Sequence, residues 1–495
     1  MKRLFLTFCL AVTVLASNAK TFSGNIIMTR NGQTSNADVT MTMNSNGNGQ
    51  SSFVLQVNPF GIVRINDVPA ATAGNITVYS ADRDAITDSG NMRATIFARV
   101  TDGMMVADIN IPTQNTTIHF NSVGDHFQLP NSDMEAWNAG NGEPDRWHGF
   151  KSAGGGFANT SAGLVTLASS EDVRQGATGH SAVMKAGSIF GVVANGTMTN
   201  GQLMAGSMSA SDTRNHAEMD KNKTNTDANG DLFYMPLYAK PDMFNVWLKY
   251  TQGTENIDNM ANVSVKTFDG TYYQEPVDKE YTNLSGSIVG GQIPAGGWTF
   301  YSFPFDYDSY AGNNAATEAI FVTFSTNGNP GQGSKNDALY VDDIELVYLG
   351  AITDLRYQGV TIAGWNPAVT EYTLEMTDVP SLNDFTATIV GASAVLTKTM
   401  EQNTDGSYRI AISVVSADLQ TATCYIINVI NPSTQVIVGD VDNNGVVGIA
   451  DVTALIDYLL GGNVDINTQA ADVDNDGSIS ISDVTTLIDM LLSGN

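Results

Sequence analysis

Two short segments near the end of the chain carry acidic residues at the spacing of a calcium-binding loop. In each segment, side chains with oxygen atoms stand at loop positions one, three, five and twelve, and position seven can offer a backbone carbonyl. Calcium takes six to eight oxygen ligands, and this order of carboxylates, amide and carbonyl supplies them. The predicted ligands are Asp440, Asp442, Asn444, Val446 and Asp451 in the first loop and Asp472, Asp474, Asp476, Ser478 and Asp483 in the second. We therefore expect two bound calcium ions between residues 438 and 495.

The residues around each loop predict the elements that hold it. Gly445 and Gly477 stand at position six, where the chain of such a loop turns sharply. Apolar residues at helical spacing follow each loop, whereas no helical pattern precedes either one. Val447 and Ile479, at position eight, are expected to pair the two loops through a short strand. Each closing acid is Asp, whose side chain reaches less far than the usual Glu.

A calcium loop followed by a single helix occurs twice in tandem here. This arrangement resembles the dockerin family. The resemblance implies that calcium folds the module and that the helix faces dock on a cohesin domain of a partner protein. The residues to which it assigns docking are Ile449, Ala450, Ile456 and Asp457, and Ile481, Ser482, Ile488 and Asp489. Well-known dockerins often carry hydroxyl residues and a basic pair at such positions. This chain has mostly apolar residues and Asp there, which leaves the type of cohesin open.

The charge balance of the whole chain limits its partners. Acidic residues outnumber basic ones by 51 to 23, and the formal net charge is -28. Such a chain is repelled by nucleic acid and by anionic membrane surfaces, so we expect neither as a partner. A length of 495 residues predicts several domains. The low share of charged residues, 15%, together with 47 glycines, is typical of exported β-proteins with many turns.

The first nineteen residues have the pattern of a secretory signal peptide. A basic start at Met1-Lys2-Arg3 precedes an apolar run from Leu4 to Leu15, and small residues follow up to Ala19. After cleavage Cys424 is the one remaining cysteine, which excludes an internal disulfide. The mature chain holds no stretch long and apolar enough for a transmembrane segment. We therefore expect a secreted protein, extracellular or associated with a cell surface.

Short alternating strands predict a mainly β, multidomain fold upstream of the tail. Residues 20–123 contain about eight candidate strands separated by turns such as Asn31-Gly32, enough to close a β-barrel. This segment resembles the calycin-like β-barrels; its interior either holds a small ligand or, as we favour, is filled by side chains. Residues 350–431 resemble an immunoglobulin-like sandwich. Residues 432–437 are expected to be a linker, and residues 438–495 form the small helical domain with the calcium loops.

Residues 124–349 form the region in which we expect contact with sugars. Its opening around Trp137 and Trp147, its strand around Trp247 and its closing Asp342-Asp343 strand resemble the carbohydrate metabolism domain family, whose folds are jelly-roll sandwiches. Sugar rings stack on exposed aromatic side chains, and the candidates for ligand binding are Trp147, Tyr272 and Tyr273. Trp247 and Trp298 are predicted to lie in the core. The polar stretch 211–231 is predicted to be a loop.

A third metal site is an open question in this region. Asp133 and Glu135 open its first strand, and Asp342 lies on its last strand. Neighbouring strands in a sandwich would let the three acids share one structural calcium ion. The alternative is that they are solvated turn residues.

Three functions remain open from the sequence. The first is a secreted carbohydrate-binding component of a polysaccharide-degrading system that docks on a cohesin partner. The second is a glycoside hydrolase with its active site in residues 124–349, although no spacing pairs two carboxylates such as Glu143, Asp145 and Glu275 for that chemistry. The third is a structural or adhesive surface protein. Because no catalytic motif is present, we expect a non-catalytic protein.

Overall fold

The computed structural model describes residues 19–122, 127–189, 191–253, 259–431 and 437–493. The predicted signal peptide, 1–19, and the predicted linker, 432–437, lie almost wholly outside these ranges. The chain divides into two compact units, one of Met1–Ala368, Thr386–Thr399 and Ile412–Cys424, the other of Val369–Phe385, Met400–Ala411 and Tyr425–Asn495. No helix in the described residues is long and apolar enough to cross a membrane.

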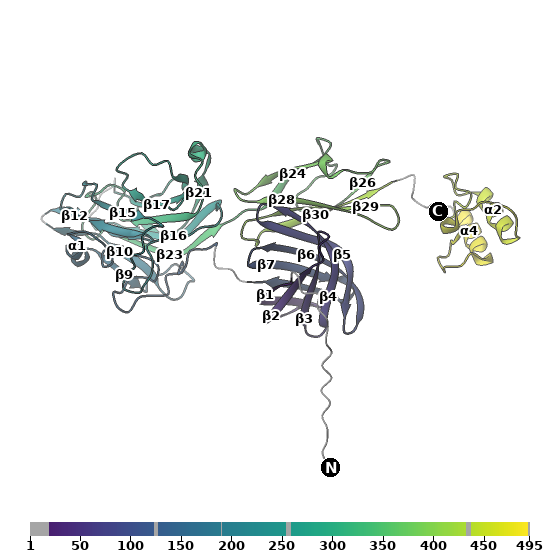
Figure 1. Cartoon of the computed structure of the whole chain (residues 1–495), viewed down its shortest axis with the longest axis horizontal. Helices are drawn as coiled ribbons and strands as arrows, with labels where there is room; N and C mark the ends of the chain where they lie inside the picture. The colour runs from purple at the N-terminus through teal and green to yellow at the C-terminus, as the bar shows by residue number, and fades with distance from the viewer. Residues whose placement is uncertain (1–18, 123–126, 190, 254–258, 432–436, 494–495) are drawn as a thin grey trace, which may run out of the picture. The chain divides into compact units, whose positions relative to one another are not determined.

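The first domain is a closed, antiparallel, up-and-down barrel, drawn in purple in Figure 1. Its strands are β1 Ala19–Arg30, β2 Gln33–Ser45, β3 Gln50–Val57, β4 Gly61–Ala73, β5 Ile76–Thr87, β6 Gly90–Thr101, β7 Met104–Ile111 and β8 Thr116–Asn121. Asn31 and Gly32 join β1 to β2 with positive φ angles of 49° and 78°, as a two-residue hairpin turn requires. Strand β8 closes the barrel on β1. The inward side chains, among them Met41, Phe53 and Phe120, form one buried apolar cluster, in agreement with a barrel filled by side chains.

The second domain is a sandwich whose strands pair in the order β13-β22-β17-β19-β21-β16-β23-β10-β9. Their bounds are β9 Thr166–Ser170, β10 Ser181–Lys185, β13 Thr197–Thr199, β16 Met243–Thr251, β17 Ala261–Phe268, β19 Leu284–Ile288, β20 Gln292–Ile293, β21 Gly296–Asp306, β22 Ala319–Ser325 and β23 Ala338–Val347. Along β16 the residues Phe244, Val246 and Leu248 are buried in the core. Trp247 alternates with them and is half-buried on the other face, as is Trp298 on β21, so the prediction that both lie in the core is wrong.

Smaller elements are added to this sandwich. They are α1 Ala158–Leu164, the pair β11 Gly187–Ile189 and β12 Val192–Ala194, and a sheet of β14 Gln202–Ala205, β15 Asn215–Met219 and β18 Tyr273–Glu275. Strand β15 lies inside the stretch predicted to be a loop, residues 211–231. The prediction is wrong for these five residues, because Ala217, Glu218 and Met219 are buried between two neighbouring strands.

The third β-domain consists of seven strands in two sheets, as expected for a sandwich. One sheet contains β24 Ala351–Tyr357, β25 Val360–Thr361 and β27 Phe385–Val390; the other contains β26 Glu371–Glu375, β28 Val395–Gln402, β29 Tyr408–Val415 and β30 Ala422–Ile430. Three 3-10 helices, Pro112–Gln114, Asp308–Asn313 and Leu382–Asp384, occur among these β-domains.

The C-terminal domain is helical and is drawn in yellow in Figure 1. It contains α2 Ile449–Leu459, α3 Thr468–Ala471 and α4 Ile481–Ser493. Its small core is made of Val441, Val452, Leu455, Ala471, Val484 and Leu487. Val447 and Ile479 pack against this core, and neither lies in a strand, so the predicted strand pairing of the loops is wrong. The short helix α3 directly precedes the second loop, where no helix was expected.

Candidate functional site

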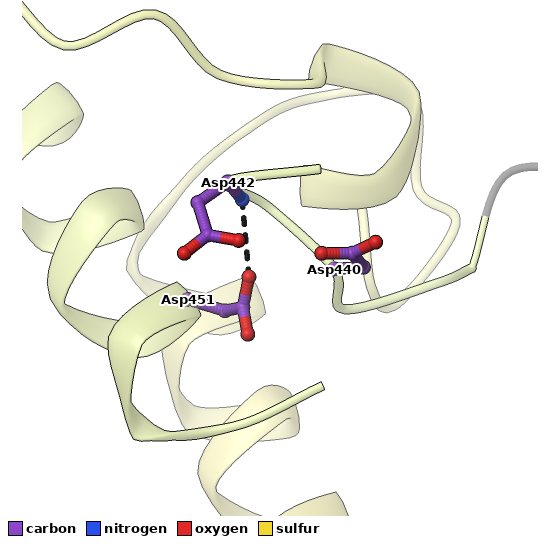
Figure 2. Close-up of side chains that lie close together, drawn as sticks. All are labelled: Asp440, Asp442 and Asp451. Atoms are coloured by element: carbon purple, nitrogen blue, oxygen red, sulfur yellow. Dashed lines mark hydrogen bonds between the residues drawn. The ribbon is translucent and has the colours of Figure 1, made fainter. Parts of the chain in front are cut away.

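The first calcium loop brings together the side chains that its spacing predicts. Oxygen atoms of Asp440, Asp442 and Asp451 lie within 4.8 Å of one another (Figure 2). Asn443 and Gly445 have positive φ angles of 57° and 88°, which turn the chain around this point. The backbone N–H groups of Asn444 and Gly445 donate to the Asp440 carboxylate at 3.0 and 2.9 Å. The loop therefore folds around its first aspartate.

The closing aspartate of each loop also caps the helix that follows it. The Asp451 carboxylate accepts the N–H of Gly448 at 2.7 Å and that of Asp442 at 3.0 Å. In the second copy, Asp483 accepts the N–H of Ser480 at 2.8 Å and that of Asp474 at 3.2 Å. A carboxylate in the first turn of a helix satisfies free N–H groups and is favoured by the helix dipole. The same carboxylate therefore contacts both the loop and the start of the helix.

The second loop repeats the geometry with one difference. The compact ligand group is Asp472, Asp474 and Asp476, and it does not include Asp483. Burial opposes the charged form of Asp483, but the N–H groups of Ser480, Asp474 and Val473 lower its pKa below the ordinary value. The N–H groups at position seven, of Val446 and Ser478, donate to Asn444 and Asp476 at 2.9 and 2.8 Å. That the carbonyls of Val446 and Ser478 bind an ion stays a prediction.

The chemistry of both loops fits calcium. Residues 438–495 contain ten Asp and no Lys, Arg or His. Asp440 and Asp451 are 4% and 0% exposed, so carboxylates are buried here without a basic side chain of the same domain to pair with. Buried charges of one sign require a counter-charge, and an all-oxygen donor set of this kind selects a hard divalent cation. When bound, calcium supplies that positive charge.

The residues with an implied docking role lie on the surface of this domain. Ile449 and Ile481, at the starts of α2 and α4, are 76% and 70% exposed. Seven residues further along each helix, Ile456 and Ile488 are 38% and 36% exposed. Ala450, Asp457 and Asp489 are also exposed, and Ser482 is half-buried. Each helix thus presents an isoleucine pair at the same loop-relative positions.

The predicted sugar-binding aromatic residues are mostly buried. Trp147 is 0% exposed, and its indole N–H donates to the carbonyl of Pro130 at 3.2 Å, so it belongs to the core. Tyr273 lies in β18. It is 1% exposed because its face of the strand packs on the sandwich core. Tyr272 is half-buried, and its hydroxyl donates to Gln274 at 2.7 Å. The predictions for Trp147 and Tyr273 as stacking platforms are wrong.

The three acids proposed to share a calcium ion in the sandwich do not form a compact ligand group. Asp133 is exposed, and Glu135 accepts the backbone N–H of His180 at 2.7 Å, which lowers the pKa of Glu135. Asp342 is buried; this burial and then the neighbouring Asp343 raise its pKa to about 7. Among the described residues the compact acidic groups are those of the two C-terminal loops. A calcium ion at this place stays a prediction.

The sandwich contains a cleft of about 540 Å³ that no sequence motif marks. Its floor is the outer face of β13, β22 and β17. The register aligns Thr197, Ser325 and Asn262 in one row across the three strands. Thr323 and Ser264 lie in the next row and also line the cleft. The floor is therefore a patch of hydroxyl and amide groups.

Apolar side chains form the walls of the cleft. They come from α1, β12, β14 and the following loop, and include Phe157, Leu164, Val192, Val193, Met204 and Met208. Asn215 on β15 holds that loop, because its side chain accepts the N–H of Gly206 and Ser207, each at 2.9 Å. Gly155 lets the start of α1 approach β14: its φ is 96°, and a Cβ there would lie 2.4 Å from the carbonyl oxygen of Ala205. The walls are thus held by the Asn215 side chain and by close backbone packing at Gly155.

Glu275 is the one carboxylate among the described residues that line this cleft. Its Oε1 atom accepts the hydroxyls of Ser264 at 3.0 Å and Tyr273 at 2.9 Å. His216, also a lining residue, lies 3.1 Å from Glu218, whose pKa is lowered to about 2: burial opposes this shift, and His216 and Lys223 outweigh it. The side-chain oxygen of Asn195 is buried and accepts no hydrogen bond from the described residues.

Comparison with known proteins identifies one domain of the chain. Residues 438–492 match the family described as dockerin type I domain. A search of curated proteins gives no match.

Three solved structures show similarity to longer parts of the chain. The N-terminal CBM22-1-CBM22-2 tandem of Paenibacillus barcinonensis Xyn10C has 11% identity and a TM-score of 0.19 over 66% of this chain and 92% of its own. The M60 catalytic domain with CBM51-1 and CBM51-2 of Clostridium perfringens ZmpB has 11% identity and a TM-score of 0.12 over 84% and 40%. A bifunctional GH43-CE protein of Bacteroides eggerthii has 9% identity and a TM-score of 0.19 over 70% and 55%. All three TM-scores lie well below 0.5, so the site assignment rests on the residues of this chain.

Proposed function

We propose that this protein is a secreted, non-catalytic carbohydrate-binding component of a polysaccharide-degrading system. The cleft of the sandwich binds a glycan, and the C-terminal domain, holding two calcium ions, docks on a cohesin-bearing partner. The observation that carries the glycan role is the floor of the cleft, with its rows of hydroxyl and amide side chains.

The surfaces of the cleft complement a sugar. A sugar ring presents hydroxyl groups at its edge and C–H groups on its faces. The hydroxyls pair with the side chains of Ser325, Asn262 and Thr323, while the C–H groups pack on the apolar walls. Cavities of a few hundred Å³ with apolar walls and few polar groups are the usual form of small-ligand sites. The carboxylate of Glu275, which lies 3.8 Å from the Lys266 ammonium, accepts further ligand hydroxyls.

The carboxylate count supports binding in preference to hydrolysis. Glycosidases place two carboxylates on opposite sides of the scissile bond, about 5–10 Å apart. Glu275 lines the cleft, whereas Glu143 is buried and accepts the N–H groups of Gly149 and Lys151 at 2.9 and 3.0 Å. Asp145 binds the side chain of Asn229 at 2.8 Å. A second acid facing Glu275 across the cleft is absent from its described lining residues.

The docking role rests on the C-terminal domain. Its match to the dockerin type I domain implies a cohesin partner and a location outside the cell. The exposed isoleucines of α2 and α4 supply an apolar contact surface. The C-terminal domain docks on the partner, and the sandwich binds glycan. The protein thus attaches a sugar-binding domain to a larger assembly.

The glycan role is tested with the calcium-loaded, full-length protein on an array of neutral oligosaccharides, followed by calorimetry with the best ligand. Glu275→Gln keeps an acceptor for Ser264 and Tyr273 but removes the charge, so we expect the affinity to fall by about tenfold or more. Glu280→Gln, an exposed acid outside the cleft, is the matched control and leaves the affinity unchanged.

Other outcomes assign a different function. Release of reducing sugar by the wild-type protein, abolished by Glu275→Gln, establishes a glycoside hydrolase. Absence of binding to every glycan, with cohesin binding retained, indicates a structural or adhesive protein.

A further inference from the structure

The sheet of β21, β16 and β23 carries a row of aromatic side chains on the face that points away from the core. The register pairs Trp247 with Phe300 on β21, and Lys249 with Tyr340 on β23. The Trp247 and Phe300 rings lie 5.5 Å apart, and the Trp298 and Tyr340 rings lie 6.1 Å apart. We call these four residues, Trp247, Trp298, Phe300 and Tyr340, the aromatic face.

The aromatic face is open to solvent. Phe300 is 47% exposed, and the other three rings are half-buried. The cleft lies over β13, β22 and β17, at the opposite end of the strand order from β23, and none of the four rings lines it. Single exposed apolar residues are common on protein surfaces. A group of exposed aromatic side chains, in contrast, marks an interaction surface.

Cations hold two of the rings in fixed positions. The Arg174 guanidinium lies 5.2 Å from the ring centre of Trp247, and the Lys249 ammonium lies 4.9 Å from that of Tyr340. Asp172 accepts the indole N–H of Trp298 at 3.0 Å and binds Lys249 at 2.5 Å. A ligand that meets rings already held in place loses less side-chain entropy on binding.

The two cations of this surface are each paired with a carboxylate. Lys249 is bonded to Asp172, and Arg174 is bonded to Asp343 at 2.6 Å. A charged ligand therefore gains little here. A second copy of this chain is disfavoured as well, because each copy carries a net charge of -28.

The polar groups beside the rings suit a neutral, hydroxyl-rich ligand. On the same face, Ser302 donates to Asn245 at 2.6 Å, and Asn245 donates to Glu345 at 3.1 Å. These side chains alternate donors and acceptors along a line next to Phe300 and Trp247. Hydroxyl groups can enter such a network by exchanging for water.

We propose that the aromatic face is a second glycan-binding surface, which takes a neutral polysaccharide by stacking sugar rings on Phe300 and its neighbours. This inference rests on the glycan-binding role but not on the cleft. Two sites on one domain increase the retention of the protein on a repeating polymer without any additional contact at either site.

The test uses the full-length, calcium-loaded protein with neutral polysaccharides: cellulose, mannan, xylan, galactan and starch. Retention is measured by co-sedimentation with the insoluble polymers and by affinity electrophoresis with the soluble ones. Phe300→Ser removes the most exposed ring, and we expect retention on the bound polysaccharide to fall by about tenfold. Trp298→Ala is the second variant, with its folding checked by thermal unfolding. Tyr238→Ser removes a ring that is 59% exposed outside the aromatic face and is expected to have no effect.

The comparison with Glu275→Gln separates this inference from the proposed function. If Glu275→Gln reduces glycan binding and both aromatic-face variants retain it, the cleft is the site and the aromatic face is not. If no polysaccharide or oligosaccharide binds the wild-type protein, both proposals fail. A concentration-dependent dimer in light scattering that Phe300→Ser abolishes identifies the face as a contact between copies and overturns the inference.

Discussion

The calcium domain and the cleft of the sandwich are both proposed binding sites, but they differ in how the sequence encodes them. The ligands of each calcium loop lie within twelve consecutive residues, and their order alone specifies the ion. The lining of the cleft extends from Phe150 to Gly331, and its polar floor exists only through the pairing of β13, β22 and β17. A site whose ligands lie in a single loop can be recognised in the sequence. A site assembled by the register of distant strands cannot.

The two regions also differ in what holds them together. The core of the calcium domain is six buried apolar side chains beneath ten aspartates, while the sandwich core is large and includes Trp147, Phe244 and Phe324. A small domain with so little apolar burial depends on another source of stability, here the ion. The calcium domain should therefore respond to metal, and the sandwich to packing and protonation.

Removal of calcium is expected to have the largest effect. Chelation unfolds residues 438–495, because the mutual repulsion of the aspartates is then unrelieved, and the β-domains stay folded. The described part of that tail holds no Trp, so tryptophan fluorescence follows the β-domains while helical circular dichroism follows α2 and α4.

The double variant Asp440→Ala plus Asp472→Ala is the matched genetic test. It is expected to lose helical signal in the presence of calcium, as chelation does. Unchanged circular dichroism on chelation would exclude the ion as the source of stability in the tail.

Truncation of a core side chain in each of the two regions is expected to have the next largest effect on stability. Phe324→Ala in the sandwich is expected to cost about 3–5 kcal/mol, and Leu487→Ala in the tail about 2–5 kcal/mol, through lost burial and a cavity. Both side chains are 0% exposed. Excess calcium offsets the loss for Leu487→Ala by mass action but not that for Phe324→Ala. Denaturant titrations at several calcium concentrations measure the difference; equal calcium dependence of both variants contradicts it.

The stability of the sandwich is expected to depend on pH through the protonation of His148. The ring is 0% exposed, lies tilted 4.5 Å from the Phe233 ring and 3.7 Å from the Asp227 carboxylate, and has no hydrogen-bond partner among the described residues. Burial lowers its pKa from 6.5 to about 4. Between these values the unfolded chain takes up a proton and the folded domain does not, so stability falls as the pH drops from 6.5 to 4, by about 3 kcal/mol in total.

Denaturant unfolding of the β-domains, followed by tryptophan fluorescence across this pH range, measures the loss. His148→Met removes the titrating group, and its unfolding free energy should show a smaller decrease over the same window, relative to its own value at pH 7. An unchanged pH slope in the variant assigns the acid sensitivity to other groups.

The residues that sequence analysis placed wrongly share a physical cause. Trp147 follows a charged turn and Trp247 sits among apolar neighbours, yet the first is buried and the second faces outward. Alternation along a strand shows that neighbouring residues face opposite ways, but it does not say which face meets the core when both carry aromatic residues. The barrel was predictable because polar and apolar residues alternate there with a clear contrast. Asn215 was missed, and Glu275 was named only as an unpaired acid, because their roles depend on strands brought together from distant parts of the chain.

The exposed isoleucines of the tail are expected to have the smallest effect on stability. Ile449→Ser and Ile481→Ser alter side chains that are 76% and 70% exposed, so each changes the free energy of unfolding by about 0.5 kcal/mol or less. Helical circular dichroism and calorimetric calcium binding should therefore match the wild-type protein. Binding to type I cohesin domains, measured by surface plasmon resonance, should weaken in the double variant because the apolar contact on both helices is lost. If instead cohesin binding persists and calcium affinity drops, these residues support the loops and the docking surface lies elsewhere on the domain.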